Sequence, residues 1–318
     1  MNGALVLALP SKGRLKEQAE AWLADSGLPI SAGGERAYTA EIAALAGIEV
    51  RLVSTAEIAE QLVTGEVHLG VTGEDLLREL AGSLEGRVVL LQALGFGHAD
   101  LVVAAPRSWI DVADMADVDE VAHLFLARTG RRLRVATKFP SLTRAFFARH
   151  GVADYRIVES AGATEGAPAA GAAELIVDIT TTGATLAANG LKRLAGGLIL
   201  ASQAQLAASP SAGWDDSRLK AATGFVRIIE ARARARRAAT LAWPAGAEAA
   251  ARAALAAAPV LSAQARPHGV LVDAGELFGA AEALARAGVG PVGVTRPAYV
   301  FEAGSRAMER LEAALRSA

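Results

Sequence analysis

The stretch Ile176-Val177-Asp178-Ile179-Thr180-Thr181-Thr182-Gly183-Ala184-Thr185-Leu186 indicates more about the fold than any other part of this 318-residue chain. An apolar run ends in one carboxylate, then three threonines and a glycine precede a helical pattern. A short apolar run that passes through a glycine turn into a helix is typical of strand–loop–helix units in parallel sheets. Ligands of such sheets bind beyond the carboxyl ends of the strands.

The same loop has the features of a phosphate-binding site. The first N–H groups of a helix lack intrahelical acceptors, and the helix dipole favours an anion beside them. Gly183 allows the backbone to approach a ligand closely, and the threonine hydroxyls add neutral donors. Asp178 could accept hydrogen bonds from ribose hydroxyls. The alternative is purely local: Thr182 caps the helix and Asp178 satisfies a turn.

Two further segments place cations just after expected strands. In Leu9–Leu15, Lys12 and Arg14 flank a glycine before a helical pattern. Arginine binds phosphate through its planar fork and lysine as a point charge, so the pair predicts a polyphosphate contact. A solvated turn is the alternative. In Arg134–Arg144, Lys138 follows a strand end and could meet a diphosphate.

Acidic residues stand in two other loops. Gly73-Glu74-Asp75 opens a helix after an apolar strand. One of these carboxylates could recognise the amino or hydroxyl groups of a nucleotide, although acidic residues also suit a helix N-terminus electrostatically. Residues 159–168 are rich in small side chains that permit close approach of a ligand, and Glu165 could point into a cleft.

Apolar runs alternate with helical patterns through the first two thirds of the chain, which predicts βαβ units and a mostly parallel sheet. Strands are expected at 5–9, 48–53, 67–71, 88–94, 101–105, 133–136 and 175–179. Helices are expected at 15–26 and 56–63, from 74 through 80, through 146–147, and after 183.

The composition changes near residue 230. Residues 227–237 are basic and lack apolar periodicity after Ile229, which favours a solvated helix or linker over an anion-binding patch. Beyond them the pattern predicts a small α+β sandwich of βαββαβ order. Residues 288–293 match G-x-G-x-x-G, but they follow a helix and precede a strand, so they predict a turn and not a dinucleotide site.

The composition excludes several functional classes. The chain has no cysteine, which rules out disulfides, thiolate metal sites and thiol nucleophiles, and its five histidines are scattered. A net charge of -2 argues against a nucleic-acid coat or a membrane-surface binder. No apolar run approaches about 18 residues, and residues 1–10 lack the basic start of a signal peptide. A cytoplasmic protein is expected.

The motifs S-K-G-R-L, G-V-T-G-E-D, R-V-A-T-K-F-P, G-A-T-E-G-A-P and V-D-I-T-T-T-G-A-T-L occur in this order. Over about residues 4–230 the chain resembles the ATP phosphoribosyltransferase family. The resemblance implies an α/β fold with two lobes of the type II periplasmic-binding-protein architecture. Residues 1–100 and 196–230 would form the nucleotide lobe and 101–195 the other lobe. Residues 238–318 would form an ACT-like regulatory domain.

The resemblance also implies the activity: transfer of a phosphoribosyl group from phosphoribosyl pyrophosphate (PRPP) to N1 of ATP, the first step of histidine biosynthesis. Lys12, Arg14 and Asp178 would be catalytic, with Mg²⁺ carried mainly by substrate and Asp178 as its candidate protein ligand. The PRPP loop would comprise Asp178, Thr180, Thr181, Thr182, Gly183, Ala184 and Thr185. Nucleotide and diphosphate groups would meet Lys12, Arg14, Arg36, Arg51, Gly73, Glu74, Asp75, Lys138 and Glu165.

For partners, the resemblance implies histidine as a feedback inhibitor bound by the tail, and a hexamer or dimer, or else a separate regulatory subunit. Two departures stand out. Thr181 occupies a position where the family commonly has a second acidic residue, and residues 260–266 lack the Pro-Thr pair of the regulatory tail. Two other functions remain open: a solute-binding protein of the same architecture, and a phosphoribosyltransferase that uses a free base.

Overall fold

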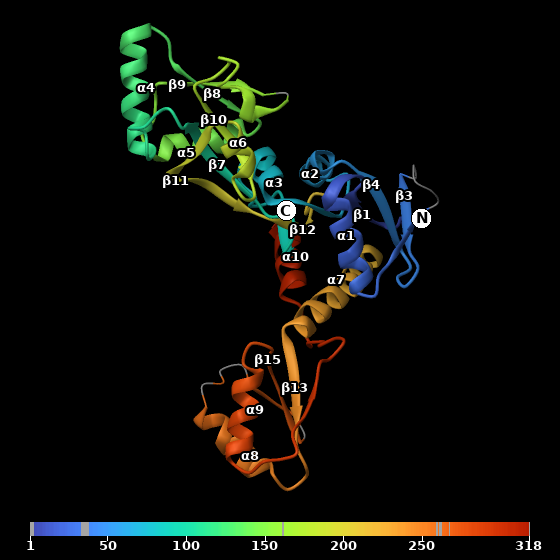
Figure 1. The fold of residues 1–318 in the computed structure, drawn as a ribbon. Helices are drawn as coiled ribbons and strands as arrows, with labels where there is room; N and C mark the ends of the chain where they lie inside the picture. The colour runs from blue at the N-terminus through green and yellow to red at the C-terminus, as the bar shows by residue number, and fades with distance from the viewer. Residues whose placement is uncertain are drawn as a thin grey trace.

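The protein folds into two α/β lobes and a third, smaller module (Figure 1). The computed structural model describes residues 3–32, 38–160, 162–258, 260, 263–266 and 268–317. Each of the three parts has its own sheet, of seven, five and four strands. The two-lobe α/β fold with an additional α+β module is therefore confirmed.

The first lobe has a sheet whose strands follow the order β2 (Ile30–Ala32), β3 (Thr39–Ile42), β4 (Ile48–Val53), β1 (Leu5–Pro10), β5 (Leu69–Gly73), β12 (Ala204–Ala208) and β6 (Val89–Ala93). The central strands β4, β1 and β5 are parallel. Every residue of β1 is buried, because alternate side chains point into two different apolar clusters. Such double-sided burial is typical of parallel sheets that carry helices on both faces.

Helices cover both faces of this sheet. Helices α2 (Thr55–Thr64) and α3 (Glu74–Ala81) pack on one face. Helices α1 (Gly13–Asp25), α7 (Asp216–Arg236) and α10 (Arg306–Ser317) pack on the other.

The second lobe has a sheet of order β11 (Leu191–Ser202), β7 (Ala99–Pro106), β10 (Leu175–Thr180), β8 (Leu133–Thr137) and β9 (Tyr155–Glu159). Strand β8 pairs in parallel with both β10 and β9. Helices α4 (Met115–Thr129) and α5 (Pro140–Arg149) cover one face, and the short helix α6 (Ala184–Ala188) covers the other, where the 3-10 turn η1 (Thr164–Gly166) contacts β10.

The chain passes between the lobes twice. Residues 94–98 lead from β6 to β7, and Gln203 leads from β11 back to β12. The two crossings are bonded to each other, since the Leu94 N–H donates to the Ala204 carbonyl (3.0 Å) and the Ala204 N–H donates to the Phe96 carbonyl (2.9 Å). The hinge between the lobes is therefore a hydrogen-bonded pair of segments.

The third module extends from the far end of α7 (Figure 1). Its elements are β13 (Ala238–Ala242), α8 (Glu248–Ala257), β14 (Gln264–Arg266), β15 (Gly269–Asp273), α9 (Leu277–Arg286) and β16 (Gly293–Thr295). The strands form one antiparallel sheet of order β14-β15-β13-β16. The βαββαβ order is as predicted, and residues 288–292 lie between α9 and β16, which begins at Gly293.

Helix α10 returns from the third module to the first lobe (Figure 1). Met308 and Leu311 join the lobe's apolar core. Arg310 donates from Nη2 to the carbonyl oxygens of Leu90 (3.2 Å) and Leu91 (2.7 Å) on β6. The end of the chain thus packs with the first lobe, although it lies within the range 238–318 that the sequence assigned to the tail domain.

The basic segment 227–237 is helical, as expected, but it is not simply solvated. Arg232 and Arg236 both contact Asp25 at the end of α1, at 2.8 and 2.6 Å, and Arg234 pairs with Glu230 at 3.3 Å. The reason is that α7 buries its apolar residues on the first lobe and so brings its arginines beside α1. Among the described residues, no helix is long and apolar enough to span a membrane.

Candidate active site

A cavity of about 970 Å³ lies between the two lobes. Its lining comes from the loops after β1, β4 and β5 of the first lobe, the loops after β8 and β10 of the second, and the crossing at 95–99. The carboxyl ends of the parallel strands in both lobes therefore open into one space, which is where ligands of open α/β sheets bind. Of the predicted site residues, the cavity is lined by Lys12, Arg14, Gly73, Asp75, Lys138, Asp178 and Thr181.

Three cations line the cavity from opposite lobes. Lys12 is the N-cap of α1, Arg14 follows one residue after Gly13, whose φ is +73°, and Lys138 connects β8 to α5. All three cations are exposed, and within the part of the chain that the structure describes none of them has a salt bridge or a hydrogen bond to a protein group. Unpaired cations that converge on one cleft raise the local concentration of anionic ligands.

Asp178 lies at the carboxyl end of β10, half-buried, and accepts a hydrogen bond from the Ile179 N–H at 2.9 Å. Burial raises the pKa of its carboxyl group above the usual value, while the Ile179 N–H opposes that shift. The charge of Glu165 adds to the rise and the charge of Lys138 opposes it. Glu165 and Lys138 thus lie close enough to Asp178 to act on its ionisation.

The loop after β10 is held by its own threonines. The Gly183 N–H donates to Thr180 Oγ1 (2.9 Å), and the Ala184 N–H donates to Thr182 Oγ1 (3.3 Å). These bonds are the local turn contacts that the sequence left as an alternative. Within the described residues, the N–H groups of Thr181, Thr182 and Thr185 have no protein acceptor. The loop therefore keeps donors for a ligand.

Helix α6, which follows this loop, has five residues, fewer than a phosphate site based on the helix dipole needs. Few aligned peptide units sum to a small dipole, so the dipole contribution expected from the sequence is weak here. Gly183 has a φ of +78°, a conformation that disfavours residues with a Cβ. Anion binding by this loop therefore depends on its amides and hydroxyls.

The two adjacent acidic residues at the start of α3 have different surroundings. Asp75 is buried and lines the cavity, and its Oδ1 accepts a hydrogen bond from Ser202 Oγ at 2.8 Å. Burial raises the pKa of its carboxyl group. Glu74 pairs with Arg78 at 2.7 Å and accepts from Gln205 Nε2 at 2.8 Å, and it does not line the cavity.

Other predicted site residues lie outside this lining. Residues Thr180, Thr182, Gly183, Ala184 and Thr185 belong to the loop beside the cavity but not to its wall, and Glu165 lies on η1. Arg51 pairs through Nε with Glu49 at 2.8 Å. Arg36 lies outside the described residues.

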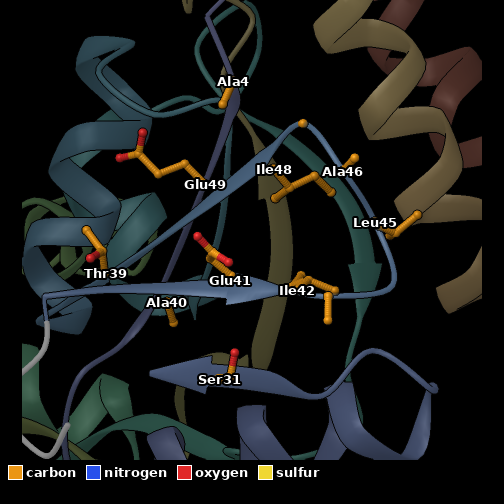
Figure 2. A pocket seen from close by; sticks show the side chains of 12 residues that line it. Ala4, Ser31, Thr39, Ala40, Glu41, Ile42, Leu45, Ala46, Ile48 and Glu49 are labelled. Atoms are coloured by element: carbon orange, nitrogen blue, oxygen red, sulfur yellow. The ribbon is translucent and has the colours of Figure 1, made fainter. Parts of the chain in front are cut away.

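A second cavity, of about 860 Å³, lies over the edge of the first sheet (Figure 2). Glu41 and Glu49 are its charged lining residues, and its described lining contains no lysine or arginine. A lining whose charged side chains are both carboxylates disfavours a polyphosphate, even though Arg51 pairs with one of them. The cavity between the lobes is therefore the better candidate.

Sequence reasoning missed several lining residues. Phe96 and His98 belong to the crossing, which Gly95 and Gly97 signal as a turn after the strand. Ser54 caps α2 by accepting from the Glu57 N–H at 3.2 Å. Its signal is an S-x-x-E pattern directly after an apolar strand.

The acidic side chains of the cavity suit a metal ion that arrives with its substrate. Among the described residues, no three histidine or acidic side chains form a group that could hold a metal. Magnesium usually binds one or two carboxylates plus substrate phosphates and keeps several waters. Asp178, half-buried at the cavity wall, fits that requirement as a single protein ligand.

Comparison with known proteins agrees with this geometry. Residues 54–231 match the model of the family described as HisG: ATP phosphoribosyltransferase. The chain is 60% identical over 318 residues to the ATP phosphoribosyltransferase of Caulobacter vibrioides, covering 100% of this chain and 99% of that protein. It is 59% identical over 236 residues to the Nitrobacter winogradskyi enzyme of the same name, covering 74% of this chain and 73% of that protein.

A solved structure agrees as well. The ATP phosphoribosyl transferase (HisG:HisZ) complex from Thermotoga maritima contains a chain that aligns with a TM-score of 0.55 and 26% identity, covering 71% of this chain and 96% of that one. The sequence match extends over more than half of the chain, and the Caulobacter relative matches its whole length. The chain therefore belongs to the ATP phosphoribosyltransferase family and is a transferase.

Proposed function

We propose that this protein transfers the phosphoribosyl group of PRPP to N1 of ATP with release of pyrophosphate, the first step of histidine biosynthesis. One observation carries the proposal: Lys12 and Arg14 of one lobe share a cavity with Lys138 and Asp178 of the other. A reaction between two polyanions needs cations from both sides, because each substrate must be held while its charge is offset.

In the proposed reaction, the lone pair of adenine N1 forms the bond to C1 of the ribose. The bond between C1 and the diphosphate oxygen breaks, and its electrons leave with pyrophosphate. Positive charge develops on the sugar and negative charge on the leaving group. Positioning and electrostatic stabilisation then supply most of the acceleration. No covalent nucleophile is required, in keeping with a chain that has no cysteine.

We propose a role for each of the side chains in or beside the cavity. Asp178 would accept hydrogen bonds from the ribose hydroxyls, and the loop 180–185 would bind the 5-phosphate through its free amides and hydroxyls. Lys12, Arg14 and Lys138 would bind the diphosphate and triphosphate groups. Gly73 and Asp75 would line the nucleotide side, with Glu165 nearby. Mg²⁺ held by substrate and Asp178 would neutralise charge on the leaving diphosphate.

We assign a separate binding function to each of the three parts of the molecule. We assign the nucleotide to the first lobe, PRPP to the second, and feedback inhibition by histidine to the ACT-like third module. A homo-oligomer is expected, and a separate regulatory subunit is the alternative, since the Thermotoga maritima structure is a HisG:HisZ complex. A cytoplasmic location stays a prediction from the sequence.

The test is to mix the purified protein with ATP, PRPP and MgCl₂ and to measure both pyrophosphate and the absorbance of phosphoribosyl-ATP. Both should appear together and should stop when EDTA is added. Parallel reactions replace ATP with adenine or orotate, and a titration with histidine tests inhibition. Turnover with a free base but not with ATP would replace this proposal, and binding without pyrophosphate release would indicate a solute-binding protein.

A further inference from the structure

The carboxylate of Glu79 connects the two lobes beside the cavity. Glu79 lies on α3 of the first lobe. Its two carboxylate oxygens accept hydrogen bonds from backbone N–H groups in the first turn of α5, which belongs to the second lobe. Oε1 accepts from the Ser141 N–H at 2.7 Å, and Oε2 accepts from the Leu142 N–H at 2.9 Å. We propose that Glu79 is a positioning residue that fixes Lys138 in the cavity by capping α5 from the opposite lobe; this rests on the proposed function.

Helix α5 has no cap of its own. It begins at Pro140, its N-cap is Phe139, and no side chain of the N-cap accepts a hydrogen bond from the first turn. The first amides of a helix need outside acceptors. A carboxylate is a strong acceptor for them and also complements the positive end of the ten-residue helix. Glu79 therefore supplies across the lobe boundary what N-cap residues usually supply locally.

The same side of α3 makes two more contacts with the second lobe. Asp75 is bonded to Ser202 at the end of β11, and Leu76 packs against the apolar clusters of both lobes. Residues 75 and 79 are one helical turn apart and so lie on one face. Helix α3 thus fixes the orientation of the second lobe at two polar points with an apolar contact between them.

Lys138 lies close in sequence to the start of α5, where Glu79 binds. It stands two residues before the start of α5, and the Phe139 N–H donates to Thr137 Oγ1 at 2.9 Å, which fixes the turn between β8 and the helix. A shift of α5 therefore moves the Lys138 backbone with it. Displacements of about 1 Å reduce catalysis as much as about 100-fold when reacting groups are held at fixed positions.

A double-mutant cycle tests the dependence on Lys138. Glu79→Ala should lower kcat/KM for PRPP about tenfold and should change KM for ATP little. A loss of about tenfold is the size of effect that loss of a hydrogen bond to a charged group produces. In a Lys138→Ala background the same change should lower kcat/KM less than twofold, because the residue it positions is gone. Glu79→Gln, which keeps the shape and one acceptor, should give an intermediate loss.

Glu85→Ala is the matched control, since Glu85 is an exposed glutamate of the same lobe that lines no described part of the cavity. It should keep wild-type kinetics. Equal losses from Glu79→Ala with and without Lys138 would show that Glu79 does not act through Lys138, and would overturn the proposal.

A second measurement does not require activity. Because the chain has no cysteine, Glu60→Cys on α2 and Glu120→Cys on α4 allow one spin label on each lobe, both at exposed positions. Pulsed electron–electron double resonance measures the distance between the two labels. The doubly labelled protein with Glu79 should give a narrow distance distribution, and Glu79→Ala and Glu79→Gln in the same background should give a broader or shifted one. An unchanged distribution in both variants overturns the proposal. If the spin-labelled protein that retains Glu79 gives the narrow distribution but forms no phosphoribosyl-ATP, the proposed function is overturned instead.

Discussion

The Thr181 hydroxyl donates a hydrogen bond to the carbonyl oxygen of His98 at 3.1 Å. Thr181 belongs to the loop that we assign to the ribose phosphate, and His98 belongs to the crossing between the lobes, so the bond fixes that loop to the hinge. An ionised carboxylate at position 181 would only accept, so it could not form the bond that the threonine hydroxyl makes here.

Replacement of Thr181 by valine should lower kcat/KM for PRPP by about 2- to 10-fold, since one hydrogen bond contributes about 0.5–1.5 kcal/mol. Valine keeps the branched shape but cannot donate. Thr181→Ser keeps the hydroxyl and should stay within about twofold of the wild type. Steady-state kinetics with PRPP as the varied substrate distinguish the two. Equal rates for all three proteins would show that the bond to His98 has no part in PRPP binding.

Loss of a cavity cation should impair activity without loss of the fold. Lys12→Ala and Lys138→Ala should each lower kcat/KM about 100-fold, as removal of a group that stabilises developing charge does. Their melting temperatures should stay close to wild type, because both side chains are exposed and lack salt bridges within the described chain. Lys16→Ala, on the helix that Lys12 precedes, removes an equal charge that pairs with Glu20, and this variant should remain active.

Asp178 should determine the acid limb of the pH profile. Burial, reinforced by Glu165, raises the pKa of its carboxyl group, so the group takes up a proton at a higher pH than an exposed aspartate does. In its proposed role, the ionised form would accept hydrogen bonds from the ribose hydroxyls and would bind Mg²⁺. Therefore kcat/KM for PRPP should fall as the pH drops through that raised value. Asp178→Asn should be nearly inactive at every pH, and its residual activity should lack the acid limb. If the acid limb is unchanged in this variant, another group causes it.

His68 should make the first lobe sensitive to acid. The Val6 N–H donates to its Nδ1 at 3.1 Å, so Nε2 carries the proton and donates to the Gly213 carbonyl at 3.2 Å. Burial lowers the pKa of this imidazole, so the unfolded chain takes up the proton first as the pH falls. Its contribution to stability is thus complete above about pH 6.5 and is lost as the pH falls through the lowered value.

The measurement is the melting temperature at about pH 7.5 and about pH 5.5. The wild type should lose more stability over this interval than His68→Gln, whose amide can accept and donate but does not titrate. A parallel loss in both proteins would assign the acid sensitivity to other groups.

Local patterns explain which elements the sequence predicted. Strand β4 was expected at 48–53 and is found there, because its alternation of apolar with polar residues between turn residues depends little on distant contacts. Strand β11 was missed, since it contains Gly196-Gly197 and register shifts against β7 that break its periodicity. Helix α10 was missed although its apolar residues recur at helical spacing, because the expected pattern ended with the βαββαβ tail.

The sequence by itself determined the α/β alternation, the order of the polar loops and the residue types suited to phosphate, because these depend on neighbours along the chain. The tertiary structure decided which side chains meet. Asp75 faces the cavity while the adjacent Glu74 pairs with Arg78, a difference set by the rotation of α3 against both lobes. The capping of α5 by Glu79 and the return of α10 to β6 likewise join residues far apart in sequence, and only the packing of whole lobes brings such groups together.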